Sequence, residues 1–326
     1  MLRKLTAMLI CVLLALAPAL AEDVTFNYRF ADSGEAAELL LSKRAYYESM
    51  SQNDLNFRMQ KLDATLEELE AFAAAQTLDF TGAEKAAIDG AMTDIETVCR
   101  ERGYALPIVD GIVFAKTTMK EECGAGAYTH GTQIYLGQYA MDYALSKDPD
   151  DVDYFREIVA HELFHCLTRN HPDFRAAMYA ILGFTVVDQD YDFAPAVRER
   201  IISNPDVEHH NAYAAFDING EMLDCAVVFT TAKPYQKPGD SFFDDMVAGL
   251  VPLDDLGTMY TSDDAANFWE VFGENTDYVT DPEEALANNF SYTIVYGVHG
   301  REYKTPEIIE AIDAYLRSAG EAEAAA

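Results

Sequence analysis

The stretch "VAHELFHCLTRN", residues 159–170, lies at the middle of a chain of 326 residues and decides how the rest is interpreted. Its two histidines, His161 and His165, are four positions apart. On an α-helix such residues lie about 40° apart around the axis and about 6 Å along it, so both imidazoles can reach one metal ion. Glu162 is turned roughly 100° from His161 and flanks such an ion without binding it. The pattern H-E-x-x-H therefore predicts a zinc helix.

The residues around this pattern support a helix with a buried back. We expect the segment "PDDVDYFREIVAHELFHCLTRN", residues 149–170, to be helical, to be capped by Asp150 or Asp151 and to end near Asn170. The face opposite the histidines is apolar and is expected to pack into the core; it carries Phe155, Ile158, Val159, Leu163 and Leu167.

A catalytic zinc site needs a third protein ligand besides the two histidines. Three segments offer one: "SNPDVEHHNAY" with Asp206, Glu208, His209 and His210; the strand residues Glu221 and Asp224; and "DPEEALANNF", residues 281–290, with Glu284. Asn-Pro-Asp is typical of a turn, and the strand carboxylates suit a solvated face. Glu284 is expected on a helix beside the zinc helix. The stretch from Asp281 to Glu284 also fits a purely local capping box with proline at N1, which is the alternative.

Two motifs in this order resemble a known family. His161-Glu162-x-x-His165 followed by Glu284-Ala-Leu-Ala-Asn-Asn-Phe290 is similar to the catalytic domain of the lethal-factor type of gluzincin, a zincin whose third ligand is glutamate. The resemblance implies that Glu284 is the third ligand and that Tyr278 points at the substrate carbonyl. Asn288 departs from the family pattern, which has an acidic residue there to support a histidine ligand.

The resemblance implies a fold and an activity for the whole chain. The expected fold is α+β and zincin-like, with a small mixed sheet, an active-site helix and an N-terminal helical lobe. The expected activity is that of a zinc metalloendopeptidase with one zinc ion and a peptide or protein substrate. Glu162 would take the proton of the zinc-bound water, and Tyr278, or more weakly His299, would donate to the oxyanion. The alternatives are an inactive zincin-fold binding module and a hydrolase of a cell-wall amide.

Two neighbours of the motifs carry further expectations. The segment "GAYTHGTQIYLG", residues 126–137, is expected to be a strand just before the zinc helix. In zincins such an edge strand pairs with the substrate backbone, and His130 on it is a candidate substrate contact. Glu283, next to the predicted ligand, is expected to point about 100° away from the zinc and to matter little.

The remaining pattern divides the chain into a helical region, residues 22–105, a catalytic domain, residues 106–320, and a tail, residues 321–326. The first region could also be a propeptide. The expected elements are helices at 33–76, 81–102, 171–182, 264–272, 282–296 and 305–319, a strand at 108–118 and a hairpin at 212–231 turning at Asn219-Gly220.

Composition limits the partners and the redox chemistry. The formal net charge of −33 repels phosphates, so nucleic-acid binding is excluded. Four cysteines follow the first 21 residues: Cys99, Cys123, Cys166 and Cys225. They allow two disulfides in three connectivities or four buried thiols.

The first 21 residues are typical of a secretory signal peptide. Arg3 and Lys4 form a basic start, an apolar stretch follows from Leu5 to Leu16, and Ala19-Leu20-Ala21 is a cleavage site. The apolar stretch is too short to span a bilayer, and no later stretch reaches the length of a membrane helix. The sequence therefore predicts an exported bacterial protein, secreted or in the periplasm or cell envelope.

We expect the exported protein to begin at Glu22, because the small residues at positions 19 and 21 suit signal peptidase. Amino-terminal sequencing of the protein recovered from outside the cytoplasm measures this directly. An intact Met1 on the exported chain contradicts the prediction.

Overall fold

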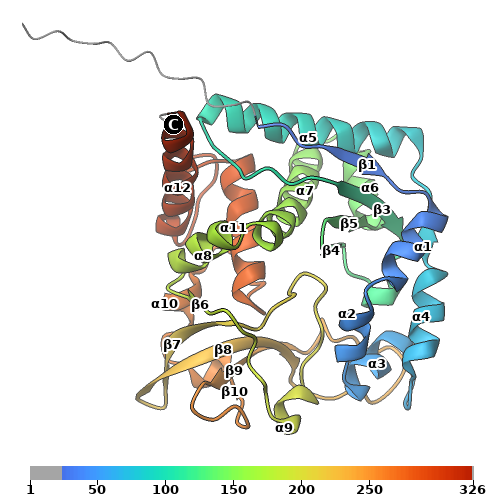
Figure 1. Ribbon diagram of the computed structural model, residues 1–326, viewed down its shortest axis with the longest axis vertical. Helices are drawn as coiled ribbons and strands as arrows, with labels where there is room; N and C mark the ends of the chain where they lie inside the picture. Colours follow the sequence, from blue (N-terminus) through green and yellow to red (C-terminus); the bar gives the residue numbers. More distant parts are fainter. Residues whose placement is uncertain (1–23, 325–326) are drawn as a thin grey trace, which may run out of the picture.

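A computed structural model describes residues 24–324, which form an α+β structure with two five-stranded sheets (Figure 1). The predicted signal peptide, residues 1–21, and the two residues after its cleavage site lie outside the described residues. The first sheet is mixed and has the order β1 (Tyr28–Phe30), β3 (Ile112–Thr117), β5 (Gln133–Leu136), β4 (Ala127–His130), with β2 (Thr77–Leu78) also on β3. The second is antiparallel, with β10 (Tyr260–Thr261), β9 (Met246–Pro252), β8 (Glu221–Thr231), β7 (Ala212–Ile218) and β6 (Thr185–Val186).

The helix with the H-E-x-x-H pattern, α7 (Pro149–Asn170), crosses the middle of the molecule beside α11 (Pro282–Val295) (Figure 1). Its end is as predicted, whereas its N-cap is Asp148, two residues before the expected position, since the Asp148 side chain accepts from the Asp150 amide. Pro149 occupies the first helical position, where a missing N–H costs nothing. The helices α5 (Gly82–Arg102), α6 (Gln138–Ala144) and α8 (Pro172–Ile181) also contact α7.

Strand β3 is buried on both faces, and its side chains alternate between two clusters. Ile112 and Phe114 face the main core with α5 and α7, whereas Val113 and Ala115 face a smaller cluster with α1 (Ser33–Leu41). Residues 112–115 are all apolar, as expected for a strand covered on both sides, whereas the buried Lys116 that follows them is paired with Glu84. The sheet therefore supports α7 from one side and the N-terminal helices from the other.

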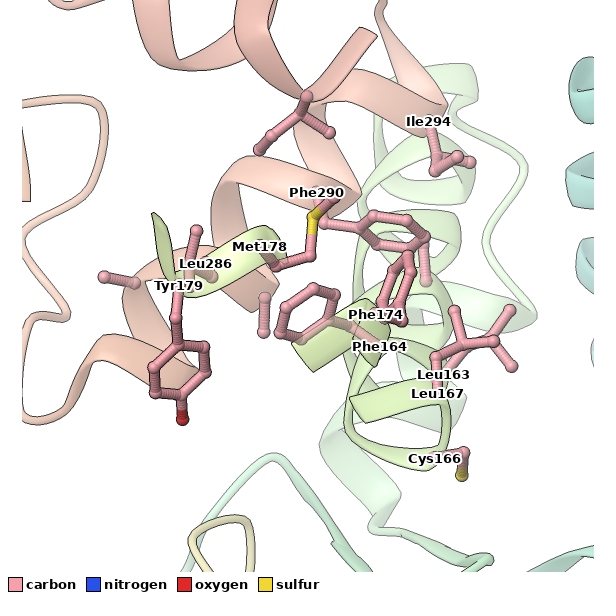
Figure 2. Close-up of a cluster of buried hydrophobic side chains, with 14 of the residues drawn as sticks. Leu163, Phe164, Cys166, Leu167, Phe174, Met178, Tyr179, Leu286, Phe290 and Ile294 are labelled. Atoms are coloured by element: carbon pink, nitrogen blue, oxygen red, sulfur yellow. The ribbon is translucent and has the colours of Figure 1, made fainter. Parts of the chain in front are cut away.

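The back of α7 packs against α8 and α11 in one apolar cluster (Figure 2). The Phe290 ring of α11 lies 5.2 Å from the Phe164 ring, and Phe174 of α8 lies 6.0 Å from Phe164 (centroid distances). All three side chains are buried. This cluster fixes α11 beside α7 and so determines which of its residues face the histidines.

The prediction of one continuous helix over residues 33–76 is wrong. The segment forms four short helices: α1, α2 (Arg44–Ser49), α3 (Gln52–Met59) and α4 (Leu66–Ala74). Ser51 and Thr65 are N-caps whose side chains accept from amides three residues on, and Gln60 is left-handed, so new helices begin where a continuous one was expected. Strands β1 and β2 join this region to β3, and α5 packs on α7, so removing residues 22–105 as a propeptide would take away two of the three strands that pair with β3.

The expected single strand over residues 126–137 is a hairpin of β4 and β5. The chain reverses at Gly131, whose φ of 63° is accessible to glycine without strain. The reversal makes β4 the edge of the first sheet, directly beside α7.

Other expectations are confirmed with small changes. The hairpin of β7 and β8 turns at Asn219-Gly220, both with positive φ. The helix expected at 264–272 is shorter, α10 (Phe268–Phe272), and follows a 3₁₀ turn; α12 (Pro306–Ala324) reaches beyond residue 319 into the expected tail. The four cysteines are free thiols, and among residues 24–324 no helix is long and apolar enough to cross a membrane.

Truncating Phe290 to alanine should lower the free energy of unfolding by about 3–5 kcal/mol, because it opens a cavity between α7 and α11. Chemical denaturation of the metal-free protein measures this loss. Trp269→Ala on α10 is the control: its side chain is 47% exposed, so the loss should stay below about 1 kcal/mol. Equal losses would show that the packing of α11 on α7 is not a main source of stability.

Candidate metal centre

Three predicted ligands come together between α7 and α11. His161 Nε2 lies 3.1 Å from Glu284 Oε2, and His165 Nε2 lies 3.9 Å from the same oxygen. The nitrogen and oxygen ligands of one four-coordinate zinc, each about 2.0–2.1 Å from the ion, lie roughly 3.3–3.5 Å apart. His161, His165 and Glu284 thus form a set that fits a single ion.

Glu283 contacts the His165 ring. The sequence suggests that Glu283 points away from the metal site and matters little, and this contact argues against that expectation. The Glu283 Oε1 atom lies 3.1 Å from His165 Nδ1, and since a carboxylate only accepts, Nδ1 carries the proton. The lone pair of the neutral ring is therefore on Nε2, which is buried without a hydrogen-bond partner and faces Glu284. A carboxylate behind a histidine ligand is a recurrent support in metal sites.

Other groups hold the Glu283 carboxylate in place. Thr168 Oγ1 donates to Glu283 Oε1, and Tyr179 Oη donates to Oε2 at 2.8 Å. Burial alone would raise the pKa of Glu283, but the hydrogen bond and charge of His165, together with Thr168 and the Arg175 guanidinium, hold it below its usual value. Glu283 is one residue from Glu284 on α11, and its carboxylate meets α7 and α8 behind the ligand instead of solvent.

The neighbouring loop fixes the predicted third ligand. Asn204 Nδ2 donates to Glu284 Oε1, which leaves Oε2 facing the histidines. Burial raises the pKa of Glu284, but the hydrogen bond to His161 and the nearby His165 outweigh it, so its pKa lies below the usual value. Asn288, the departure from the family pattern, donates to the Glu284 backbone carbonyl and does not support a histidine.

Glu162 stands beside the ligand set at the edge of the sheet. Its Oε2 accepts from Thr129 Oγ1 of β4 at 2.7 Å, so strand and helix together orient the carboxylate. Burial raises the pKa of Glu162 to about 8; the charge of Glu284 adds to the rise, and the Thr129 hydroxyl opposes it. A bound cation would lower this pKa by favouring the charged form.

Asp206, one of the alternative third ligands, also lies at the site. Its Oδ1 is 3.9 Å from His165 Nε2, and with Glu162 and His165 it forms a second set of possible ligand atoms. That set contains Glu162 in place of His161 and would use up the proton acceptor, whereas the set with Glu284 uses both histidines. The set with Glu284 is therefore the one that leaves Glu162 free to accept a proton.

Tyr278 lines the same cleft, which has a volume of roughly 400 Å³. Burial raises the pKa of Tyr278, and the charges of Glu284, Asp206 and Glu162 raise it further, so its hydroxyl remains a proton donor. The cleft runs from the ligands along α7 past Ile158 and Tyr154, and its rim is residues 124–127.

Other candidates lie elsewhere. His209 is exposed and pairs with Asp190, and His210 lines a different cavity. The other candidates are all exposed: Glu208, Glu221, Asp224 and His299. His130 is buried among the rings of Tyr46, Tyr128 and Tyr135 and does not line the cleft. No local pattern marks Asn204, Thr129 or Glu283, because each depends on a contact between segments far apart in the chain.

The residues present fit zinc. Two imidazoles and one carboxylate are a common catalytic ligand set, and the buried Nε2 of His165 without a partner is costly unless it binds something. Burial lowers the pKa of His165 and keeps it neutral, as a ligand must be. The carboxylates of Glu162, Asp206 and Glu284, buried together, likewise favour a cation.

Comparisons of the chain with protein-family models, with curated proteins and with solved structures gave no match, so the case for a metal site depends on this geometry.

Replacing either Glu283 or Glu284 should weaken zinc binding, for different reasons. Glu284→Ala deletes a ligand and should leave the dialysed protein largely free of zinc. Glu283→Ala releases the His165 ring and should weaken affinity about 10- to 100-fold. Chelator competition with metal analysis measures both.

Glu307→Ala is the matched control for this pair. Glu307 follows Pro306 at the start of α12, as Glu283 follows Pro282 at the start of α11, but it is exposed. Its replacement should leave zinc affinity unchanged. Full zinc occupancy in Glu284→Ala would remove that residue from the ligand set.

Proposed function

We propose that the protein is an exported bacterial zinc metallopeptidase that hydrolyses peptide bonds with Glu162 as the proton acceptor. The observation that carries the proposal is the convergence of His161, His165 and Glu284 on one point beside an unliganded glutamate. A zinc ion held there supplies Lewis acidity and makes water nucleophilic near neutral pH. The edge strand β4 and a cleft alongside supply a place for an extended peptide.

Each side chain has a role that its contacts support. Glu162, fixed by the Thr129 hydroxyl, takes a proton from the attacking water and passes it to the leaving amine nitrogen. The C–N bond breaks, the water oxygen joins the carbonyl carbon, and the products are a carboxylate and an amine. Tyr278, protonated in the cleft, donates to the carbonyl oxygen as it gains charge.

Glu162→Gln should abolish most hydrolysis and keep zinc bound, because the three ligands are untouched while the proton acceptor is lost. We expect at least a 100-fold fall in turnover, measured on a denatured protein such as casein and on a peptide library. Zinc content of the same preparation is the control. Retention of the parent's rate would show that Glu162 is not the base.

The same assay separates the proposal from its alternatives. A chelator should stop hydrolysis and added zinc should restore it. A protein that binds zinc but cleaves neither casein nor the library would be a binding module. Cleavage restricted to cell-wall peptides would identify the amide hydrolase.

A further inference from the structure

The outer edge of β4 is partly covered. In an antiparallel pair, alternate residues direct their backbone groups away from the partner strand. On β4, the backbone N–H and C=O of Thr129 bond to groups outside the sheet. The outward-facing residues of β4 and of the turn after it are therefore Ala127, Thr129 and Gly131. These three residues are where an added peptide strand would pair.

Two of the three positions are already occupied. Asp206 Oδ1 accepts from Thr129 N at 2.6 Å, and Arg169 Nη1 donates to Thr129 O at 3.0 Å. Glu208 Oε1 accepts from Gly131 N at 3.1 Å. Arg169 also donates to the Pro205 carbonyl, so α7 itself holds the loop of residues 203–208 against the edge.

The other end of the edge is open. Neither backbone group of Ala127 has a hydrogen bond outside the sheet among the described residues, and residues 124–127 line the cleft. A peptide that binds here has space beside Ala127 and meets the 203–208 loop at Thr129. Its chain must therefore end close to Glu162, which is bonded to Thr129.

The direction of pairing identifies which end this is. Strand β4 runs from Ala127 to His130, and β5 pairs with it antiparallel. A peptide added antiparallel on the other side, the commoner arrangement, places its amino end at Thr129 and its carboxyl end beside Ala127. The charge at this end comes from Asp206, because Glu208 is paired with Arg169 at 3.3 Å and only one oxygen of Asp206 accepts from the Thr129 amide. An ammonium group can bind to the second oxygen of Asp206, whereas a terminal carboxylate would be repelled by it.

We propose that the loop of residues 203–208 makes the protein an aminopeptidase, in which Asp206 binds the free amino terminus of a peptide. This inference rests on the proposed metallopeptidase function and narrows the expected endopeptidase to an enzyme that releases residues from the amino end. Asp206 is 7% exposed and borders the cleft; its Oδ2 has no hydrogen-bond partner among the described residues and is available to an ammonium group. A carboxylate oxygen of Asp206 lies within 4.8 Å of one of Glu162, so an amino terminus bound to Asp206 would be held beside the proton acceptor.

The test compares one peptide library in two forms, with free and with acetylated amino termini. With the zinc-loaded protein, mass spectrometry should show loss of single amino-terminal residues from the free form, at least 10-fold faster than any cleavage of the acetylated form. Internal cleavage of both forms at similar rates would overturn the aminopeptidase inference and leave the metallopeptidase standing.

A binding measurement tests the inference without turnover. Zinc-loaded Glu162→Gln should bind free peptides about 10- to 100-fold more tightly than acetylated ones by calorimetry, as expected for one charge-assisted contact. Equal affinity for the two forms would overturn the inference whatever the hydrolysis assay shows. Failure to bind any peptide would overturn the proposed function as well.

Asp206→Asn, made in the Glu162→Gln background, assigns the effect to one residue. The amide oxygen can still accept from Thr129, so the loop keeps its hydrogen bond and only the charge is lost. The preference for free peptides should fall to about threefold or less with zinc content unchanged. Asp190→Asn, an exposed aspartate paired with His209, is the control and should keep the full preference. An unchanged preference in Asp206→Asn would exclude Asp206 as the amino-terminal contact.

Discussion

The structure depends on the burial of charged and polar side chains around His161 and His165. The carboxylates of Glu162, Asp206, Glu283 and Glu284 are each at most 7% exposed, and isolated buried charges cost several kcal/mol apiece. The protein offsets part of this cost with hydrogen-bond donors from neighbouring segments, and the proposed cation would complete the compensation. Several surrounding segments each donate a hydrogen bond to one of these carboxylates.

The contacts can be followed outward from that centre. Glu283 fixes the His165 ring and is itself held by Thr168 and Tyr179, so α7, α8 and α11 meet at one carboxylate. The apolar cluster around Phe164 and Phe290 holds the same three helices (Figure 2). Polar and apolar contacts act on the same helices, which gives the site the preorganisation that electrostatic catalysis requires.

The loop of residues 203–208 connects the metal centre to the sheet edge. Asn204 holds Glu284, Asp206 holds Thr129, and Glu208 holds Gly131, three contacts from five residues of chain. In this position the loop contacts both the proposed ligand Glu284 and the edge of β4 where we propose that a peptide pairs. Under these proposals, metal binding and substrate length would be coupled through one segment.

The sequence by itself determined the features that depend on local spacing. His161 and His165 share a helix face because 3.6 residues make a turn, and the apolar residues opposite them identify the buried side. The hairpin at Asn219-Gly220 and the helix after Asp281-Pro282 follow from local turn and cap chemistry. Glu284 was selected because it lies on a helix in an order that resembles a known family, and it does lie beside His161.

Only the tertiary structure decided the features that depend on which segments meet. Glu283 supports His165 because α11 packs against both α7 and α8, so that the carboxylate reaches both helices, and no sequence pattern encodes that packing. Asp206 lies 77 residues from Thr129 in the chain, yet its carboxylate accepts the Thr129 amide. Hydrogen bonds across such separations arise from the packing of the whole fold, whereas periodicity reports only on neighbours within a few turns. For that physical reason the ligands could be predicted from the sequence, but their supports and the covered edge of β4 could not.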